Sequence, residues 1–74
     1  MTDLERFLAL YESVGLKPEL ATGSGSTNYQ RKIHFEQKLL FTADNCEYTD
    51  GYYGFRYEVY FDADGKFVGH GIWE

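Results

Sequence analysis

The sequence predicts an α+β fold, with one N-terminal helix packed on a small antiparallel sheet of about four strands that ends in a C-terminal β-hairpin. Apolar residues near the N-terminus recur with helical spacing, and residues 55–73 alternate between apolar and polar side chains around a turn. The 74 residues suffice for one hydrophobic core, because a chain near this size buries only about 60% of its unfolded surface. We therefore predict a single domain over residues 1–74.

The first element is a helix that we expect to run from about Asp3 to Val14. Thr2 and Glu5 form a capping-box pattern, in which a hydroxyl and a carboxylate each satisfy an unpaired amide. Gly15 provides the left-handed residue that ends many helices. The apolar residues follow the i, i+3, i+4, i+7 spacing of one helical face: Leu4, Phe7, Leu8, Tyr11 and Val14.

The middle of the chain carries weaker signals. Residues 22–27, Thr-Gly-Ser-Gly-Ser-Thr, predict a flexible Gly/Ser loop with nothing to bury. Alternation predicts a strand over residues 29–35, and a second strand is expected near residues 39–42. Residues 36–38 fit either a tight turn between them or a longer bent strand. Residues 44–54 mix Asp, Asn, Gly and Tyr, which favours a connection with exposed or partly tucked aromatic side chains.

The C-terminal hairpin gives the strongest β signal. Its turn has Asp62 in the first position and Gly65 in the fourth, which fits a type I turn followed by a G1 bulge and pairs Asp62 with Lys66. That register predicts one apolar face with four cross-strand pairs: Phe61–Phe67, Val59–Gly69, Tyr57–Gly71 and Phe55–Trp73. The helix is expected to cover this face.

The opposite face of the hairpin would then carry the pairs Glu58–His70, Arg56–Ile72 and Tyr60–Val68. Three of these residues, Tyr60, Val68 and Ile72, are apolar or aromatic where a solvated sheet carries polar side chains. We therefore predict that this face contacts a partner.

Charge and cysteine content restrict the function classes. The net charge is −5, and residues 41–74 hold all of the imbalance, which disfavours nucleic acid and anionic lipid and favours cationic partners or simple solubility. Cys46 is the only cysteine, so the chain forms no internal disulfide. The sequence shows neither a secretion signal nor an apolar run of about 18 residues, as a membrane span requires. These observations predict a cytoplasmic protein.

No catalytic, cofactor or metal site is predicted. Of the two histidines, His34 lies among basic residues and His70 faces Glu58 as an ordinary cross-strand pair. Cys46 lacks the electropositive setting of a reactive thiolate. The segment 62–66 resembles part of a calcium loop, but the first and twelfth loop positions would be Tyr60 and Gly71, which cannot supply the required carboxylates.

The function that fits these features is a small acidic, non-enzymatic protein-interaction module. Its expected partner-binding residues are Tyr48, Tyr52, Tyr53, Tyr60, Val68 and Ile72, because tyrosine combines a large rigid contact area with a polar tip. The partner is a protein of unknown identity, a second copy included. By analogy, small acidic proteins of phages and mobile elements often inhibit host proteins.

The alternative is a small-ligand-binding domain or minimal enzyme. Its aromatic pocket would lie between helix and sheet, lined by Phe55, Tyr57 and Trp73, with Glu58 or His70 at the rim.

Overall fold

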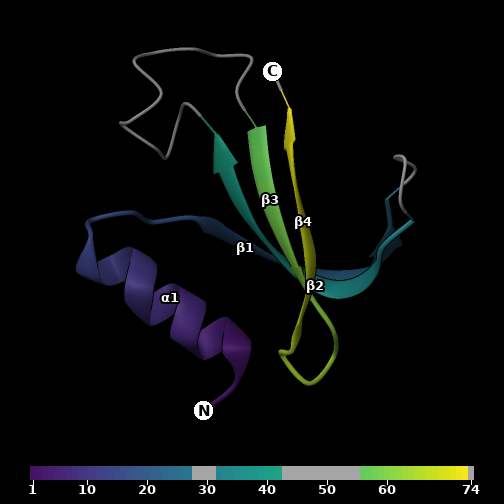
Figure 1. Ribbon diagram of the computed structural model, residues 1–74, viewed down its shortest axis with the longest axis horizontal. Coiled ribbons are helices and arrows are strands. Elements are labelled where there is room, and N and C mark those ends of the chain that lie inside the picture. Colours follow the sequence, from purple (N-terminus) through teal and green to yellow (C-terminus); the bar gives the residue numbers. More distant parts are fainter. Residues whose placement is uncertain (28–31, 43–55, 74) are drawn as a thin grey trace.

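The computed structural model describes residues 1–27, 32–42 and 56–73, and it confirms the predicted α+β class. One helix, α1, precedes a four-stranded antiparallel sheet in which every strand pairs with its neighbours in the sequence (Figure 1). The elements are α1 (Asp3–Ser13), β1 (Glu19–Ser26), β2 (His34–Thr42), β3 (Arg56–Phe61) and β4 (Phe67–Trp73).

Helix α1 begins and ends as the sequence predicts. The Thr2 hydroxyl accepts a hydrogen bond from the Glu5 amide at 3.1 Å, and the Glu5 carboxylate accepts one from the Thr2 amide at 3.0 Å, which completes the capping box. Gly15 follows the helix with a φ of 82°, in the left-handed region. The first turn is also tied to the β3–β4 turn, because the Leu4 amide donates to the Gly65 carbonyl at 2.9 Å.

Strand β1 corrects the prediction of a loop at residues 22–27, because residues 22–26 belong to this strand. Thr22 lies opposite Gln37 and Gly25 lies opposite Phe35, with a bulge between these two pairs. A Gly-Ser tract carries little strand propensity of its own, so its conformation here follows from pairing with β2.

Strand β2 decides between the two predictions for residues 36–38. These residues belong to one continuous longer strand and do not form a tight turn. Tyr29, Gln30 and Arg31 of the predicted first strand lie outside the described residues.

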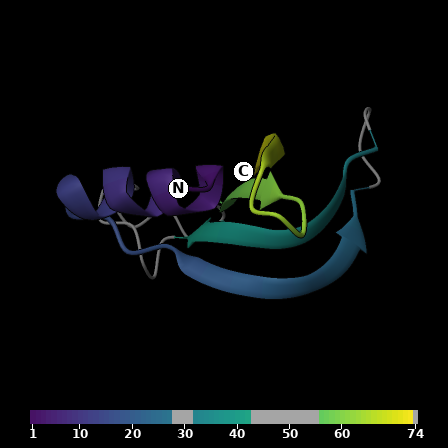
Figure 2. The same ribbon diagram turned by 90° about the horizontal axis from the view of Figure 1, so that it is seen from below.

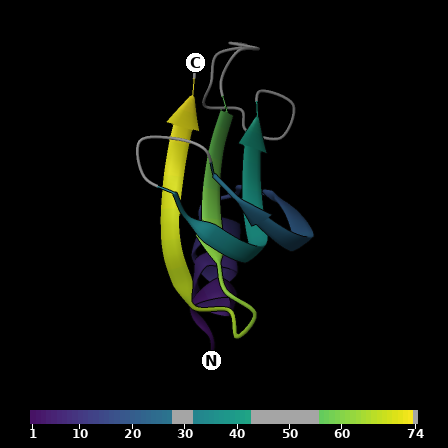
Figure 3. The ribbon, with the colours of Figure 1, turned by 90° about the vertical axis from the view of Figure 1, so that its right-hand side faces the viewer.

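The sheet is strongly coiled, and this coiling buries both faces of β3. Helix α1 lies on one side of β3 and β4, and the end of the β1–β2 hairpin curls to the other side (Figures 2 and 3). On that second side the Phe35 ring stacks on the Tyr60 ring, with 4.8 Å between centroids. Gly25 and Gly69 permit the close approach, because a Cβ atom would lie 2.7 Å from the Phe35 ring at Gly25 and 2.6 Å from Ile33 at Gly69.

The turn between β3 and β4 has the predicted form. The Gly65 amide donates to the Asp62 carbonyl at 3.0 Å, and the Asp62 amide donates to the Lys66 carbonyl at 2.9 Å. Gly65 has a φ of 79°, and the Asp62 carboxylate accepts hydrogen bonds from the amides of Asp64 and Lys66. Turn chemistry alone therefore located this hairpin correctly.

The predicted register of the hairpin is right at the turn and wrong beyond it. Phe61 lies opposite Phe67, but Val68 is then an extra residue, so that Tyr60 pairs with Gly69 and Val59 with His70. A one-residue shift moves every following side chain to the other face. The remaining observed pairs are Glu58–Gly71, Tyr57–Ile72 and Arg56–Trp73.

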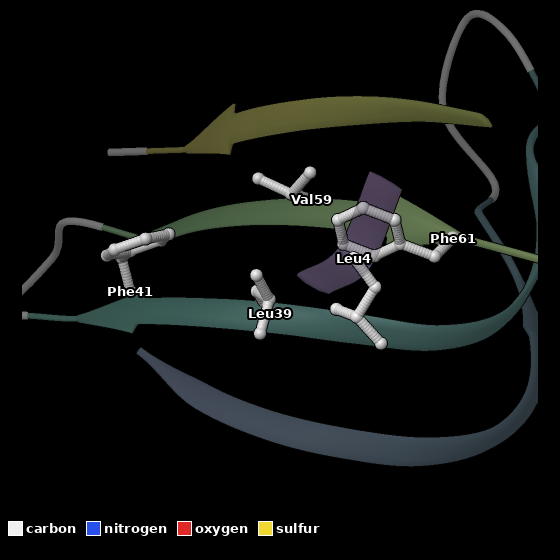
Figure 4. Close-up of a cluster of buried hydrophobic side chains, with 5 residues drawn as sticks. All are labelled: Leu4, Leu39, Phe41, Val59 and Phe61. Atoms are coloured by element: carbon white, nitrogen blue, oxygen red, sulfur yellow. The ribbon is translucent and has the colours of Figure 1, made fainter. Parts of the chain in front are cut away.

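The hydrophobic core lies between α1 and the sheet. Leu39, Val59 and Phe61 are fully buried, and Leu4 and Phe41 nearly so (Figure 4). Aromatic contacts between the helix and the sheet extend this core. The ring centroid of Phe7 lies 5.4 Å from that of Phe61 and 5.5 Å from that of Phe67. The ring centroid of Tyr11 lies 4.8 Å from that of Phe41. The amphipathic helix therefore covers the sheet with four of the residues that its periodicity selects, Leu4, Phe7, Leu8 and Tyr11. Val14, the fifth, is exposed.

Candidate functional site

The first polar feature is a buried carboxylate, which lies on the sheet face turned away from α1. Glu58 is only 6% exposed. Its Oε1 accepts a hydrogen bond from the Tyr60 hydroxyl at 2.8 Å, and its Oε2 accepts from Arg56 Nε at 2.7 Å and Lys38 Nζ at 3.3 Å. We call these four residues the Glu58 cluster. Arg56, Glu58 and Tyr60 alternate along β3, and Lys38 reaches them because it lies opposite Tyr60 on β2.

The cluster fixes the protonation states of its members. Burial raises the pKa of the Glu58 carboxyl, but the hydrogen bonds from Tyr60 and Arg56, together with Lys38, outweigh it and hold that pKa below its ordinary value. Burial and the hydrogen bond to the Glu58 carboxylate raise the pKa of the Tyr60 hydroxyl far above its ordinary value. Glu58 is therefore ionised and Tyr60 neutral over the whole physiological range.

This arrangement is suited to stabilising the fold. The charge of Glu58 is matched by two cations, and the Tyr60 hydroxyl already donates to it, so neither group is poised to exchange a proton near neutral pH. Among the described residues, no buried side-chain polar atom lacks a hydrogen-bond partner. The Glu58 cluster thus attaches β2 to β3 through side chains on the face that α1 does not cover.

A second polar group, the serine–histidine row, runs along β1 and β2. Ser26 Oγ lies 3.2 Å from His34 Nδ1, His34 Nε2 lies 3.4 Å from Glu36 Oε1, and the Ser24 hydroxyl donates to Glu36 Oε2 at 2.5 Å. These are the residue types of a hydrolytic triad. However, Ser26 lies directly opposite His34 in the ladder, and the His34 side chain is 69% exposed. The contact between Ser26 and His34 is therefore that of an ordinary cross-strand pair. The imidazole is also largely surrounded by water, whereas a catalytic base must be held in a fixed geometry by its neighbours.

The third feature is the outer side of β4, which we call the β4 edge. Among the described strands, β4 stands last in the sheet and pairs with β3 alone (Figure 1). No residue from Phe67 to Trp73 is acidic, lysine, arginine or proline. Ile72 is 65% exposed, and Phe67 is also partly open to solvent. Natural proteins usually protect edge strands with charges, proline or a covering element. The β4 edge carries neither charge nor proline of its own, so it can accept another strand.

The structure separates the residues that the sequence analysis grouped as a partner-binding surface. Tyr60 is 1% exposed, so the prediction of an exposed Tyr60 was wrong; its ring is covered by Phe35. Because of the bulge, Ile72 lies on the face that α1 covers, opposite Tyr57, and does not share a face with Tyr60. Val68 is half-buried at the bulge itself. The predictions for Tyr48, Tyr52 and Tyr53 fall outside the described residues.

The predicted pair of His70 with Glu58 is also wrong. His70 lies opposite Val59, and its ring contacts the rings of Tyr57 and Phe67 at centroid distances of 5.9 and 6.3 Å. The alternative aromatic pocket stays a prediction, because Phe55 and the Trp73 side chain lie outside the described part of the chain. Of its other residues, Tyr57 and His70 share the face that α1 covers, whereas Glu58 follows Tyr57 in β3 and projects to the opposite face.

Sequence reasoning missed the Glu58 cluster, although part of its signal was present. Arg56, Glu58 and Tyr60 stand at alternate positions and must share a face of any strand that contains them. Lys38 joins them only through the β2–β3 register, which is not readable from local sequence.

Comparison of the chain with protein-family models, with curated proteins and with solved structures finds no match. Within residues 1–27, 32–42 and 56–73, no helix has the length and apolar character needed to cross a membrane. In the same part of the chain, no three His, Cys, Asp or Glu side chains gather in a way that could hold a metal ion.

Proposed function

We propose that this chain is a small, acidic, cytoplasmic protein-interaction module without enzymatic activity, and that it binds its partner along the β4 edge by strand addition. The observation that carries the proposal is the combination of an open edge strand and exposed apolar side chains on it. An extended partner segment that adds to such an edge gains main-chain hydrogen bonds, and its alternate side chains pack on the exposed ones.

The two ends of β4 differ in whether another part of the chain already binds their outer main-chain groups. At its start, the Asp3 carboxylate accepts a hydrogen bond from the Phe67 amide at 3.0 Å, so this end is already occupied by the helix. From Gly69 to Trp73 no described residue outside β3 is paired with the strand. The binding segment of the edge is therefore its C-terminal half, where Ile72 lies.

The test is affinity capture with the wild-type chain and two matched variants. Ile72→Lys and Leu20→Lys each replace an exposed aliphatic residue on an edge strand with the same charge, since Leu20 is 45% exposed on β1. We expect the Leu20→Lys variant to retain the captured protein and the Ile72→Lys variant to lose it. Equal retention by both variants would show that binding uses another surface.

The salt dependence of partner binding distinguishes strand addition from binding through an acidic surface that mimics the charge of nucleic acid. Main-chain hydrogen bonds and apolar contacts respond weakly to ionic strength, whereas binding through the acidic residues would weaken steeply as salt screens the charges. We expect a nearly flat response. An inhibitor that mimics nucleic acid, as the analogy with small acidic phage proteins suggests, would instead show a steep loss of affinity with salt. That role remains a prediction.

A further inference from the structure

We propose that the partner of the β4 edge is the β4 edge of a second copy of this chain, paired antiparallel about a twofold axis at Gly71. This inference rests on the proposed function and names the partner of the same surface. Three properties of the edge support it: the direction of its main-chain groups, the set of registers open to it, and its lack of charge.

The direction of the main-chain groups follows from the contacts of Phe67. Its amide donates to Asp3 and so points away from β3, which makes Phe61–Phe67 a pair without mutual main-chain hydrogen bonds. Such pairs alternate with hydrogen-bonded ones along an antiparallel ladder. Because β3 pairs with β2 without a bulge, the main-chain groups of Val59 and Tyr57 point in the same direction as those of Phe61, away from β4. Their partners His70 and Ile72 therefore direct their amide and carbonyl groups outward, away from β3.

Few self-pairing registers use both outward residues. Two copies related by a twofold axis normal to the sheet must pair residues whose side chains lie on the same face. With the axis at Gly71, His70 of each copy lies opposite Ile72 of the other, and both outward residues form hydrogen-bonded pairs. An axis at His70 would set Ile72 against the bulge at Val68, and an axis at Ile72 would set His70 beyond the strand end at Trp73.

The lack of charge on the β4 edge favours a second copy of the chain over a charged partner. The chain carries a net charge of −5, so two copies repel one another wherever their acidic residues approach. The β4 edge carries no acidic residue, lysine or arginine, so it permits close approach of two copies and offers nothing to recruit a basic or acidic peptide. A neutral strand with exposed aliphatic side chains is what this edge fits, and β4 is such a strand.

The decisive measurement is the mass in solution by analytical ultracentrifugation, up to about 1 mM chain, where even weak self-association is populated. We expect the wild-type mass to rise from 8.6 kDa toward twice that value. Ile72→Lys should weaken self-association more than tenfold, and Leu20→Lys should leave it unchanged. A wild-type chain that stays monomeric at the highest concentration overturns the inference, and so does an equal effect of the two variants.

A cross-link tests the register independently. In a Cys46→Ser background, Gly71→Cys would place two thiols opposite each other at the axis, where Cα atoms about 4.5 Å apart lie within the range of a disulfide. We expect a covalent dimer after mild oxidation. Ile72→Cys is the matched control, because its two thiols would each face the partner's His70. A dimer cross-linked by the control and not by Gly71→Cys rejects the proposed axis.

The outcomes also separate this inference from the proposed function. If the wild-type chain is monomeric but captures another protein that Ile72→Lys loses, the second copy is rejected and strand addition at β4 stands. If the chain dimerises and Leu20→Lys alone disrupts the dimer, the interface is β1, and both proposals for β4 fail.

Discussion

On the face of β3 toward α1, Val59 and Phe61 are fully buried among apolar side chains, whereas on the other face Glu58 and Tyr60 are buried almost as deeply around a carboxylate. The first face is covered by a helix whose periodicity is visible in the sequence. The second is covered by the curled end of the β1–β2 hairpin and by Phe35. One six-residue strand thus supports two interiors, one held by apolar packing and one largely by charge-assisted hydrogen bonds.

The difference shows how a short chain can bury a strand on both sides. A helix needs one apolar face, and α1 provides it. The sheet supplies the second cover itself, because glycines at positions 25 and 69 let Phe35 and Ile33 come close. Packing on the first face depends little on pH, while the Glu58 cluster depends on one carboxylate staying ionised.

The largest effect should come from the apolar face. We expect Phe61→Ala to lower the free energy of unfolding by about 3–5 kcal/mol, because it leaves a cavity in contact with Phe7 and Phe67. A domain of this size has a total stability of about 4–11 kcal/mol, so the variant should be close to unfolded in urea titrations. Leu10→Ala, at a residue 57% exposed, is the control and should change stability by less than about 0.5 kcal/mol. Similar losses in both variants would contradict the assigned core.

The second effect tests the polar face. Glu58→Gln keeps the shape of the side chain and removes the charge, and we expect a loss of about 1–3 kcal/mol in the free energy of unfolding. The loss should be smaller than for a wholly buried ion pair, because the Arg56 side chain is 51% exposed and can recover water. Urea titration measures it. A change within error would mean that the Glu58 cluster contributes no net stability.

The same variant predicts a pH signature. Since the pKa of Glu58 in the folded protein lies below its value in the unfolded chain, its contribution to stability is complete above the unfolded pKa of about 4.3. It is lost as the pH falls through the lower folded value. The wild-type chain should therefore be more stable than Glu58→Gln at pH 7, and the difference should shrink in the acid range. A difference that stays constant from pH 7 to the acid range would reject the cluster as its source.

The smallest effect should come from the hydroxyl of Tyr60. Tyr60→Phe removes one donor to Glu58 but leaves the donors on Arg56 and Lys38, so we expect a loss of about 1 kcal/mol. Combined with Glu58→Gln in a double-mutant cycle, the two losses should fall short of additivity, because Tyr60→Phe removes the hydrogen bond that Glu58→Gln weakens by removing the charge. Strict additivity would show that the two groups act independently.

The elements that the sequence predicts well are those with local causes. The helix has its own periodicity and its own cap in Thr2 and Glu5, and the last turn has Asp62 and Gly65 in the positions that its geometry requires. Each signal lies within a few residues of the structure that it specifies. No partner elsewhere in the chain is needed to recognise it.

The errors have non-local causes. The strand state of residues 22–26 depends on β2, and the bulge at Val68 depends on contacts such as that between Gly69 and Ile33. Either register of the hairpin gives an alternating pattern, so the pattern could not choose between them. The predicted surface failed for two separate reasons: the bulge moved Ile72 to the other face, and the Phe35 ring on β2 covers Tyr60.

The attachment of the helix to the β3–β4 turn has a consequence for the order of folding. The bond from Phe67 to Asp3 spans 64 residues, whereas each strand pairs with the next one along the chain. Closing a long loop costs more entropy than closing a short one. The helix is synthesised before the β3–β4 hairpin, which carries Phe67 and Gly65, the two residues that bind its first turn. We therefore expect the attachment of α1 to form only after β4 has been synthesised, and the nascent chain to remain susceptible to proteolysis until then.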